Sequence, residues 1–145
     1  MYESESSVLI NDNLISVFKV AEKYPEFVNF YKAKSILYQD DKRLVVKIDH
    51  YIFGIPFRWK GEGIKNRYNE IRFRQIEGLL KGLEAHWLFR KENGKTKVTI
   101  KTNFSLNNPI LKILEKPIGN LVIKRIIDKI LINLRNIVEV KNKSL

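Results

Sequence analysis

The first thirty residues carry a strand pattern followed by a helical one. The residues of Tyr2–Ile10 predict a strand, and polar side chains at residues 11–13 then suit the start of a helix. Apolar residues recur at helical spacing through Leu14–Ala21. Pro25 lacks an N–H and disfavours the helical conformation of the residue before it, so we expect a break there. A second short helical turn is expected over residues 26–30.

Between residues 32 and 106 the period of apolar residues changes to two, the repeat of a β-strand with one buried face. Turn-forming sequences divide this region into six strands with short connections. Strands joined so closely pair antiparallel as a meander, because a parallel pair needs a crossover helix and this part of the sequence predicts none. The turns are expected at Asp40-Asp41, Gly54-Ile55-Pro56, Tyr68-Asn69, residues 78–82 and Asn93-Gly94.

The last third of the chain returns to helical spacing. Asn108 and Pro109 begin a helical region, and Pro117 stands where a second helix is expected to begin. From there the apolar pattern predicts an amphipathic helix over residues 117–140, about 36 Å long. The recurring apolar positions are Ile118, Leu121, Val122, Ile126, Ile130, Leu134 and Ile137.

Together these elements predict an α+β fold in one domain over residues 1–145. A seven-stranded antiparallel sheet with one apolar face must be covered, and the long C-terminal helix is the large element available. The curved sheet is therefore expected to wrap around that helix, with the two short helices closing one end. This arrangement leaves room for an internal cavity; the alternative is a fully packed core.

Composition narrows the function classes. The chain has no cysteine, which excludes disulfides, thiolate metal sites and a cysteine nucleophile. It shows neither a leader peptide pattern nor an apolar run of about 18 residues, so we expect a soluble cytoplasmic protein. The net charge is +11, and residues 51–145 hold 20 of the 27 Lys and Arg residues but 8 of the 16 Asp and Glu residues. That half suits an acidic or phosphate-bearing partner; an ordinary lysine-rich surface is the alternative.

Strand alternation separates aromatic from cationic side chains. In the segment Phe57-Arg58-Trp59-Lys60 the two rings face one side of the strand and the two cations the other. Binding of single-stranded nucleic acid needs rings and cations on one exposed face, so this pattern favours a lined cavity. Plain packing of the rings in the core is the alternative.

Three polar side chains fall on the predicted inner face, namely His50, Gln75 and Thr102. An unpaired polar group there costs about 1–3 kcal/mol, so they either pair with one another and with water or orient the polar end of a ligand. Leu79 and Leu80 stand between two glycines, which suits a lid over the cavity mouth; an ordinary connection is the alternative. The predicted ligand-binding residues are Ile48, His50, Phe57, Trp59, Phe73, Gln75, Leu79, Leu80, Trp87, Thr102, Phe104, Val122 and Ile126.

Motifs of catalysis and cofactor binding are weak in this sequence. His86 and Glu84 share a strand face, but without a third ligand they are expected to form a solvent-facing pair and not a metal site. Gly61 and Gly63 lack the third glycine of a dinucleotide fingerprint and are expected to mark a bulge or bend within a strand. The sequence therefore predicts no catalytic residue, no metal and no cofactor.

Several short segments carry a resemblance to a known superfamily. The segments are Val17-Phe18, Tyr24-Pro25-Glu26-Phe27, Gly78-Leu79-Leu80-Lys81, Trp87-Leu88-Phe89, Thr96-Lys97-Val98 and Asn108-Pro109. In their order and spacing they resemble the polyketide cyclase/dehydrase branch of the START-like (helix-grip, SRPBCC) superfamily, most closely its coenzyme Q-binding and ribosome association toxin proteins. The resemblance implies a helix-grip fold and a deep apolar cavity for a lipid, quinone or polyketide.

Three functions follow as hypotheses. The first is binding or transport of a hydrophobic small molecule. The second is a cyclase, aromatase or dehydratase, which would need His50 and a polar partner beside the bound substrate. The third is a ribosome-associated regulator, with RNA or an anionic membrane surface as partner of the basic second half and Lys124, Arg125 and Lys129 in the contact.

Overall fold

The computed structural model describes residues 1–24, 33–52, 54–106 and 108–143, with side chains for all of these except 33, 52, 55 and 141–143. The predicted helical turn at residues 26–30 lies outside the described residues. In chain order the elements are β1 (Tyr2–Ile10), α1 (Leu14–Ala21), β2 (Ala33–Gln39), β3 (Arg43–Ile52), β4 (Ile55–Asn66), β5 (Glu70–Glu77), β6 (Glu84–Glu92), β7 (Lys95–Phe104), α3 (Pro109–Lys112), α4 (Glu115–Ile118), η1 (Gly119–Ile123) and α5 (Lys124–Lys143).

The strands form one antiparallel sheet in the order β1-β7-β6-β5-β4-β3-β2. From β2 to β7 each strand pairs with the next in sequence, which confirms the predicted meander. β1 pairs with the free side of β7, so β1 and β2 form the two edges. Asn93 and Gly94, with φ values of 50° and 77°, make the two-residue turn between β6 and β7.

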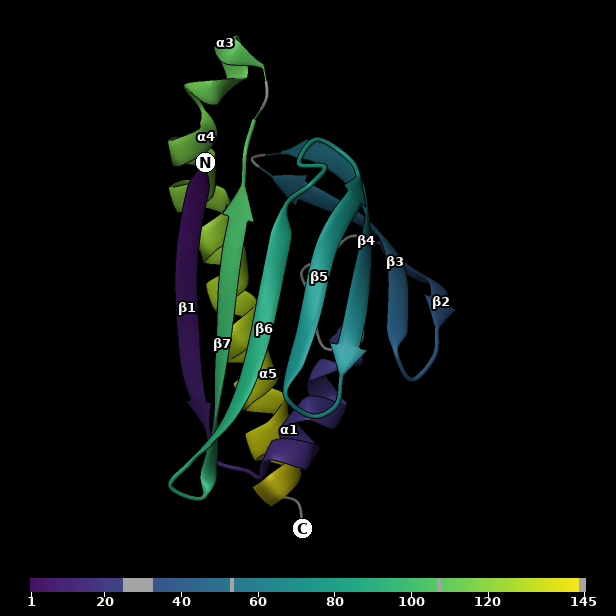
Figure 1. Ribbon diagram of the computed structural model, residues 1–145, viewed down its shortest axis with the longest axis vertical. Coiled ribbons are helices and arrows are strands. Elements are labelled where there is room, and N and C mark those ends of the chain that lie inside the picture. Colours follow the sequence, from purple (N-terminus) through teal and green to yellow (C-terminus); the bar gives the residue numbers. More distant parts are fainter. Residues whose placement is uncertain (25–32, 53, 107, 144–145) are drawn as a thin grey trace.

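The long helix lies across one face of this sheet. In Figure 1, α5 runs behind β1, β7 and β6, and α1 packs near its C-terminal end. A sheet curved around a long C-terminal helix is the helix-grip arrangement, so the predicted α+β fold class is confirmed. Within the described residues, no helix is both long and apolar enough to cross a membrane.

Helix α1 is fixed by a polar cap at its start and by burial along one face. Asn13 Oδ1 accepts a hydrogen bond from the Ser16 backbone N–H at 2.9 Å, as the capping pattern predicted. Phe18 and Ala21 are fully buried, and the ring of Phe18 packs edge-on against Phe89 of β6 with centroids 4.9 Å apart. These contacts tie α1 to the sheet.

The long helix is a continuous run of α4, η1 and α5 over residues 115–143. It begins at Glu115, two residues before the predicted start at Pro117. Pro117 lies in the first turn, where backbone N–H groups have no partner within the helix, so its missing N–H costs no hydrogen bond. At η1 the helix widens to a π-helical turn. Gly119 lies in this turn against the ring of Tyr2, and a Cβ at Gly119 would overlap that ring. The missing side chain therefore lets the helix approach β1 closely.

A β-bulge bends the sheet where β4 and β5 pair. Lys60 lies opposite Glu77, but the next residue, Gly61, lies opposite Gln75, so Ile76 is the extra residue. The bulge expected at Gly61 is therefore present, but the extra residue belongs to β5 and not to β4.

Candidate functional site

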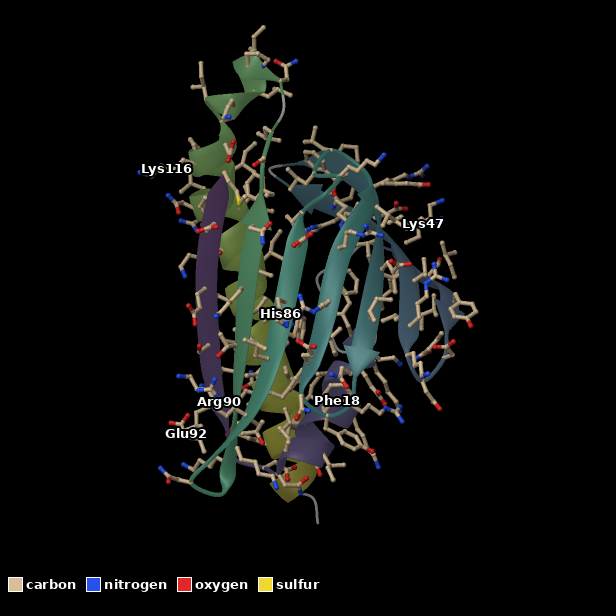
Figure 2. The ribbon with its side chains drawn as sticks, viewed as in Figure 1. Phe18, Lys47, His86, Arg90, Glu92 and Lys116 are labelled. Atoms are coloured by element: carbon tan, nitrogen blue, oxygen red, sulfur yellow. The ribbon has the colours of Figure 1, made fainter. Side chains whose placement is uncertain are left out.

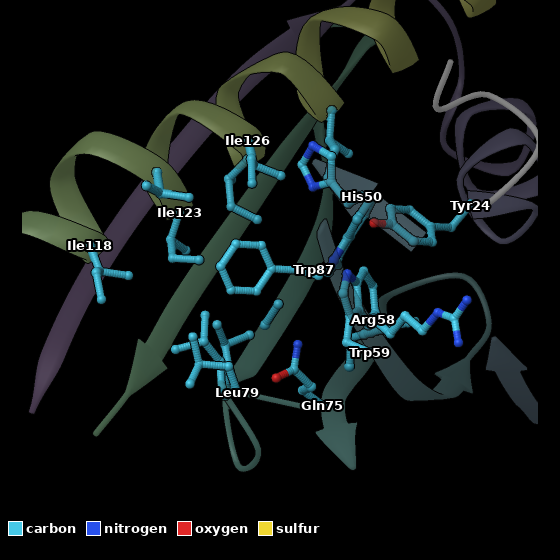
Figure 3. Close-up of a pocket in the computed structure, with 18 residues that line it drawn as sticks. Tyr24, His50, Arg58, Trp59, Gln75, Leu79, Trp87, Ile118, Ile123 and Ile126 are labelled. Atoms are coloured by element: carbon cyan, nitrogen blue, oxygen red, sulfur yellow. The ribbon is translucent and has the colours of Figure 1, made fainter. Parts of the chain in front are cut away.

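Eighteen residues enclose a cavity of about 260 Å³ between the sheet and the long helix (Figure 3). Since a dry cavity of roughly 150 Å³ is enough to hold benzene, this one has room for a larger molecule. The lining residues are Tyr24, His50, Phe57, Arg58, Trp59, Phe73, Gln75, Leu79, Leu80, Leu83, Ala85, Trp87, Ile118, Val122, Ile123, Ile126, Ile127 and Ile130.

On the sheet side the wall consists largely of inward-facing aromatic side chains. Phe57 and Trp59 of β4 line the cavity. Between them, Arg58 borders it too, but its side chain is 77% exposed and its guanidinium turns away to pair with Asp49 (Nε to Oδ1, 3.2 Å; Figure 3). The separation of rings from cations predicted by alternation is therefore present in β4.

Phe73 of β5 lies over a stretch of β4 that has no side chains on this face. A Cβ at Gly61 would overlap the Phe73 ring, and a Cβ at Gly63 would come within 2.9 Å of its Cδ2. Because both residues are glycines, the ring lies close to the β4 backbone and packs edge-on against Trp59, with centroids 6.4 Å apart. The two glycines thus set the depth of the cavity at this wall.

The opposite wall is a row of aliphatic side chains on the long helix. Figure 3 shows Ile118, Ile123 and Ile126 pointing from the helix toward the cavity. Val122 and Ile130 continue the row at a spacing of four from Ile118 and Ile126. β-Branched side chains have few rotamers, so this wall has a well-defined shape.

Two side chains bring contrasting polar groups to the cavity. Burial lowers the pKa of His50, and the positive charge of Lys129 lowers it further, so the ring is neutral at pH 7. Gln75 Oε1 is buried and accepts no hydrogen bond within the described part of the chain. A buried amide oxygen without a donor costs about 1–3 kcal/mol. A ligand that donates a hydrogen bond to it would recover part of that cost.

The loop between β5 and β6 borders the cavity at one end. Gly78 and Gly82 have φ values of 122° and 93°, a region that favours glycine, and the Gly82 N–H donates to the Gln75 carbonyl at 2.9 Å. Leu79 and Leu80 both line the cavity. Because Leu79 is also 56% exposed, it lies between the cavity and the molecular surface.

The structure brings most of the predicted ligand-binding residues together around this cavity, and three of them lie elsewhere. Those that line it are His50, Phe57, Trp59, Phe73, Gln75, Leu79, Leu80, Trp87, Val122 and Ile126.

Ile48, Thr102 and Phe104 face inward, as alternation predicted, but they do not line the cavity. Ile48 is buried in a separate cluster beneath β3, and Phe104 packs against the ring of Tyr2, with centroids 5.3 Å apart. Thr102 is 2% exposed, and its hydroxyl has no hydrogen-bond partner among the described residues. These three residues are therefore not part of the cavity lining, because other packed side chains surround them, and their ligand role stays a prediction.

Sequence reasoning also missed part of the lining. Ile118 and Ile130 belong to the apolar repeat of the predicted helix, but they were not named as ligand-binding residues. Leu83 and Ala85 share the inward parity of Trp87 and were open to the same argument. Tyr24 stands at a helix break, where no periodic signal exists.

His86 pairs with a different carboxylate from the one expected. Its Nε2 lies 2.5 Å from Oε2 of Glu70 on β5. Neither residue lines the cavity, and Figure 2 shows His86 on the face of the sheet opposite the long helix. This hydrogen bond holds the pKa of Glu70 below its usual range. The predicted pairing with Glu84 is wrong. Among the described residues, no three His, Cys, Asp or Glu side chains are grouped as a metal site.

The sequence of residues 16–131 matches the family described as polyketide cyclase / dehydrase and lipid transport. The chain belongs to this family. The START-like resemblance expected from the sequence is thereby confirmed at family level. None of the curated proteins matches the chain significantly.

Several solved structures share the fold of this chain at low sequence identity. The crystal structure of TTHA0849 from Thermus thermophilus is 19% identical with a TM-score of 0.84, over 97% of this chain and 99% of that one. The Zhui aromatase/cyclase from Streptomyces sp. R1128 is 14% identical, with a TM-score of 0.77 over 95% and 93%. A START superfamily protein from Mycobacterium smegmatis is 14% identical, with a TM-score of 0.70 over 94% and 97%. These likenesses establish the helix-grip fold.

Proposed function

We propose that residues 1–145 form one domain that binds a hydrophobic small molecule in the cavity between the sheet and the long helix. The lining carries this proposal: its described residues are largely aromatic and aliphatic and include no Asp or Glu, and its histidine is neutral at pH 7. Such a wall suits a lipid, a quinone or a polyketide-like ring system. The family to which the chain belongs is itself described by lipid transport as well as by cyclase chemistry.

The direct test is extraction of the purified protein followed by mass spectrometry. We expect an apolar molecule to be recovered in amounts comparable with the protein. Recovery of no ligand, together with an experimental structure in which side chains fill the cavity, would contradict the proposal.

The ligand is further proposed to carry one hydroxyl group. The support is the buried Oε1 of Gln75, which lacks a donor among the described residues of an otherwise apolar wall. A ligand hydroxyl placed there would satisfy this oxygen at a net gain of about 0.5–1.5 kcal/mol. A purely hydrocarbon ligand would leave it unsatisfied.

This hydroxyl preference is testable with cyclooctanol and its methyl ether, which differ in the hydrogen-bond donor. The two tryptophans of the chain, Trp59 and Trp87, both line the cavity, so their fluorescence reports occupancy. We expect the alcohol to bind about three- to tenfold more tightly than the ether. Gln75→Met should abolish the difference, whereas Gln39→Met, at an exposed position on β2, should preserve it. Equal binding of both probes to the wild type would contradict the hydroxyl assignment but leave cavity binding intact.

A second candidate function is a cyclase, aromatase or dehydratase. The observation that favours it is His50, whose lowered pKa keeps the imidazole neutral and able to accept a proton at the cavity wall. Tyr24 also lines the cavity and provides a hydroxyl on the same side of the site (Figure 3). If the chain is an enzyme, His50→Ala should remove turnover of a polyketide-like substrate while leaving its binding within a few-fold of the wild type. Equal loss of binding and turnover would indicate a role in packing.

Two more specific functions implied by the resemblance, quinone binding and ribosome association, stay predictions. A quinone ligand, as in coenzyme Q-binding proteins, would present ring oxygens that accept hydrogen bonds, and the orphan oxygen of Gln75 does not favour that. Ribosome association would use Arg125 and Lys129, which are exposed on α5; Lys124 instead donates to the Glu5 carbonyl at 3.4 Å. Salt-sensitive ribosome co-sedimentation, lost on charge reversal of Arg125 and Lys129, is the corresponding test.

A further inference from the structure

The most exposed apolar segment described in this chain stands at one end of the molecule. Ile110 and Ile113 are 78% and 79% exposed, and Leu111 and Leu114 between and beside them are 37% and 46% exposed. These four residues, which we call the apolar tip, belong to α3 and the turn after it. Figure 1 shows α3 projecting beyond the upper end of the sheet.

The apolar tip is not explained by the core of the protein. α3 contains no buried residue, although its start is fixed by Asn108, whose Oδ1 accepts a hydrogen bond from the Ile110 N–H at 2.8 Å. Exposed aliphatic side chains that occur singly are common, but four within five residues form a patch of the kind that marks an interaction site.

The charges around the apolar tip are cationic on its outer side. Lys112 is exposed and stands between the two isoleucines in the sequence. Lys116 follows on α4 and is also exposed (Figure 2). The one acidic residue of this stretch, Glu115, is turned inward and 6% exposed. Its carboxylate lies 3.0 Å from the Met1 amino nitrogen. An outward surface of aliphatic side chains and lysines matches a membrane with anionic headgroups.

The apolar tip also lies at the same end of the molecule as the loop of residues 78–82, which borders the cavity. Strand register places residues 78–82 beside the end of β7 that leads to α3, because Glu84 lies opposite both Arg74 and Asn103. Leu79 in that loop and Ile118, four residues after the tip, both line the cavity. A surface that receives the tip therefore lies close to this end of the cavity.

We propose that the apolar tip inserts into an anionic lipid membrane and holds this end of the cavity at the bilayer surface. A second copy of the chain is a poorer match, since a stable protein interface uses about 20–30 residues on each side and the tip offers four. The strength of binding at a membrane surface grows with the apolar area buried and with the attraction of basic side chains to anionic lipids, and the tip offers both.

Vesicle flotation of the full chain tests this. Vesicles of phosphatidylcholine with one-quarter phosphatidylglycerol should bind the wild type, and vesicles of phosphatidylcholine alone should bind it at least about fivefold more weakly. Ile110→Ser with Ile113→Ser should weaken binding to anionic vesicles at least about tenfold. The matched control is Ile132→Ser with Val140→Ser, which removes two exposed apolar side chains of α5 and should leave binding unchanged. Circular dichroism and thermal melting establish that each variant is folded.

Three results would overturn the proposal: no binding of the wild type to anionic vesicles, equal loss in the tip and control variants, or a concentration-dependent dimer that only the tip variant dissociates. The last result would assign the tip to self-association. Membrane binding is measured without a cavity ligand, so its failure is distinct from failure of the cavity to bind cyclooctanol.

Discussion

At the scale of single residues, missing side chains shape this protein as much as present ones. Gly119 lets the Tyr2 ring lie against the long helix, and the Tyr2 hydroxyl then donates to Asn120 Oδ1 at 3.1 Å. Gly61 and Gly63 do the same for Phe73 on the sheet side. In both places the glycine is needed for close approach and not for its backbone angles, since none of these three glycines has a positive φ.

Gly119→Ala is expected to destabilise the protein by about 1–3 kcal/mol, because the new methyl group overlaps the Tyr2 ring. Helix propensity alone predicts the opposite sign, a gain of roughly 1 kcal/mol. The free energy of unfolding measured in urea distinguishes the two expectations. In a Tyr2→Ala background the ring is absent, so the same substitution should be neutral or stabilising; an equal penalty in both backgrounds would exclude the ring overlap as the cause.

At the scale of elements, the cavity is closed by a loop and a helix of different character. The long helix presents stiff β-branched side chains and joins β1 through the contact of Lys124 Nζ with Ser6 Oγ at 3.3 Å. The loop of residues 78–82 is held by short-range backbone hydrogen bonds, including Lys81 N–H to the Gly78 carbonyl at 3.2 Å. The loop is therefore the part of the wall that can open with the smaller loss of packing.

If the loop acts as the proposed lid, Leu79→Ser should speed the dissociation of cyclooctanol several-fold, because it removes apolar cover from the cavity. Stopped-flow fluorescence of Trp59 and Trp87 measures this rate. Leu121→Ser is the matched control, since Leu121 is similarly exposed on η1 but does not line the cavity. Faster dissociation in both variants would argue against a lid.

At the scale of the whole molecule, protonation of His50 at the cavity wall should affect the free energy of unfolding. His50 has a pKa below its ordinary value of 6.5 in the folded state, so the unfolded chain takes up its proton first as the pH falls. Glu70 and Glu115 have pKa values below the ordinary 4.5, so their stabilisation is present above that value and is lost in more acidic solution. The pH range over which His50 changes the stability therefore lies above the range over which Glu70 and Glu115 change it.

Stability is expected to decline as the pH falls through 6.5, before the carboxylates begin to titrate. Urea midpoints at about pH 7.5 and pH 5.5 measure the decline. His50→Gln should flatten it, because the substituted side chain does not titrate. An unchanged slope in this variant would assign the pH dependence to other groups.

Local patterns in the sequence determined the elements, their order, and which side chains face inward. The alternation of side chains along a strand correctly placed Phe57 and Trp59 on the inner face of the sheet. Capping and turn preferences correctly predicted the helix start at Asn13 and the turn at Asn93. Each of these predictions depends only on residues close together in the chain. The antiparallel meander followed from short connections alone.

The tertiary structure decided which inward side chains meet the cavity. Thr102 has the inward parity of its lining counterparts, yet it is packed away from the cavity, because the outcome depends on where the long helix crosses the sheet. Gly119 lies against Tyr2, 117 positions earlier in the chain, and a bulge at Ile76 shifts the register of β5 on β4. Contacts between distant parts of the chain produce no repeat of apolar residues in the sequence. The sequence therefore could not predict the full cavity lining or the exposure of Ile110 and Ile113, which only the tertiary structure shows.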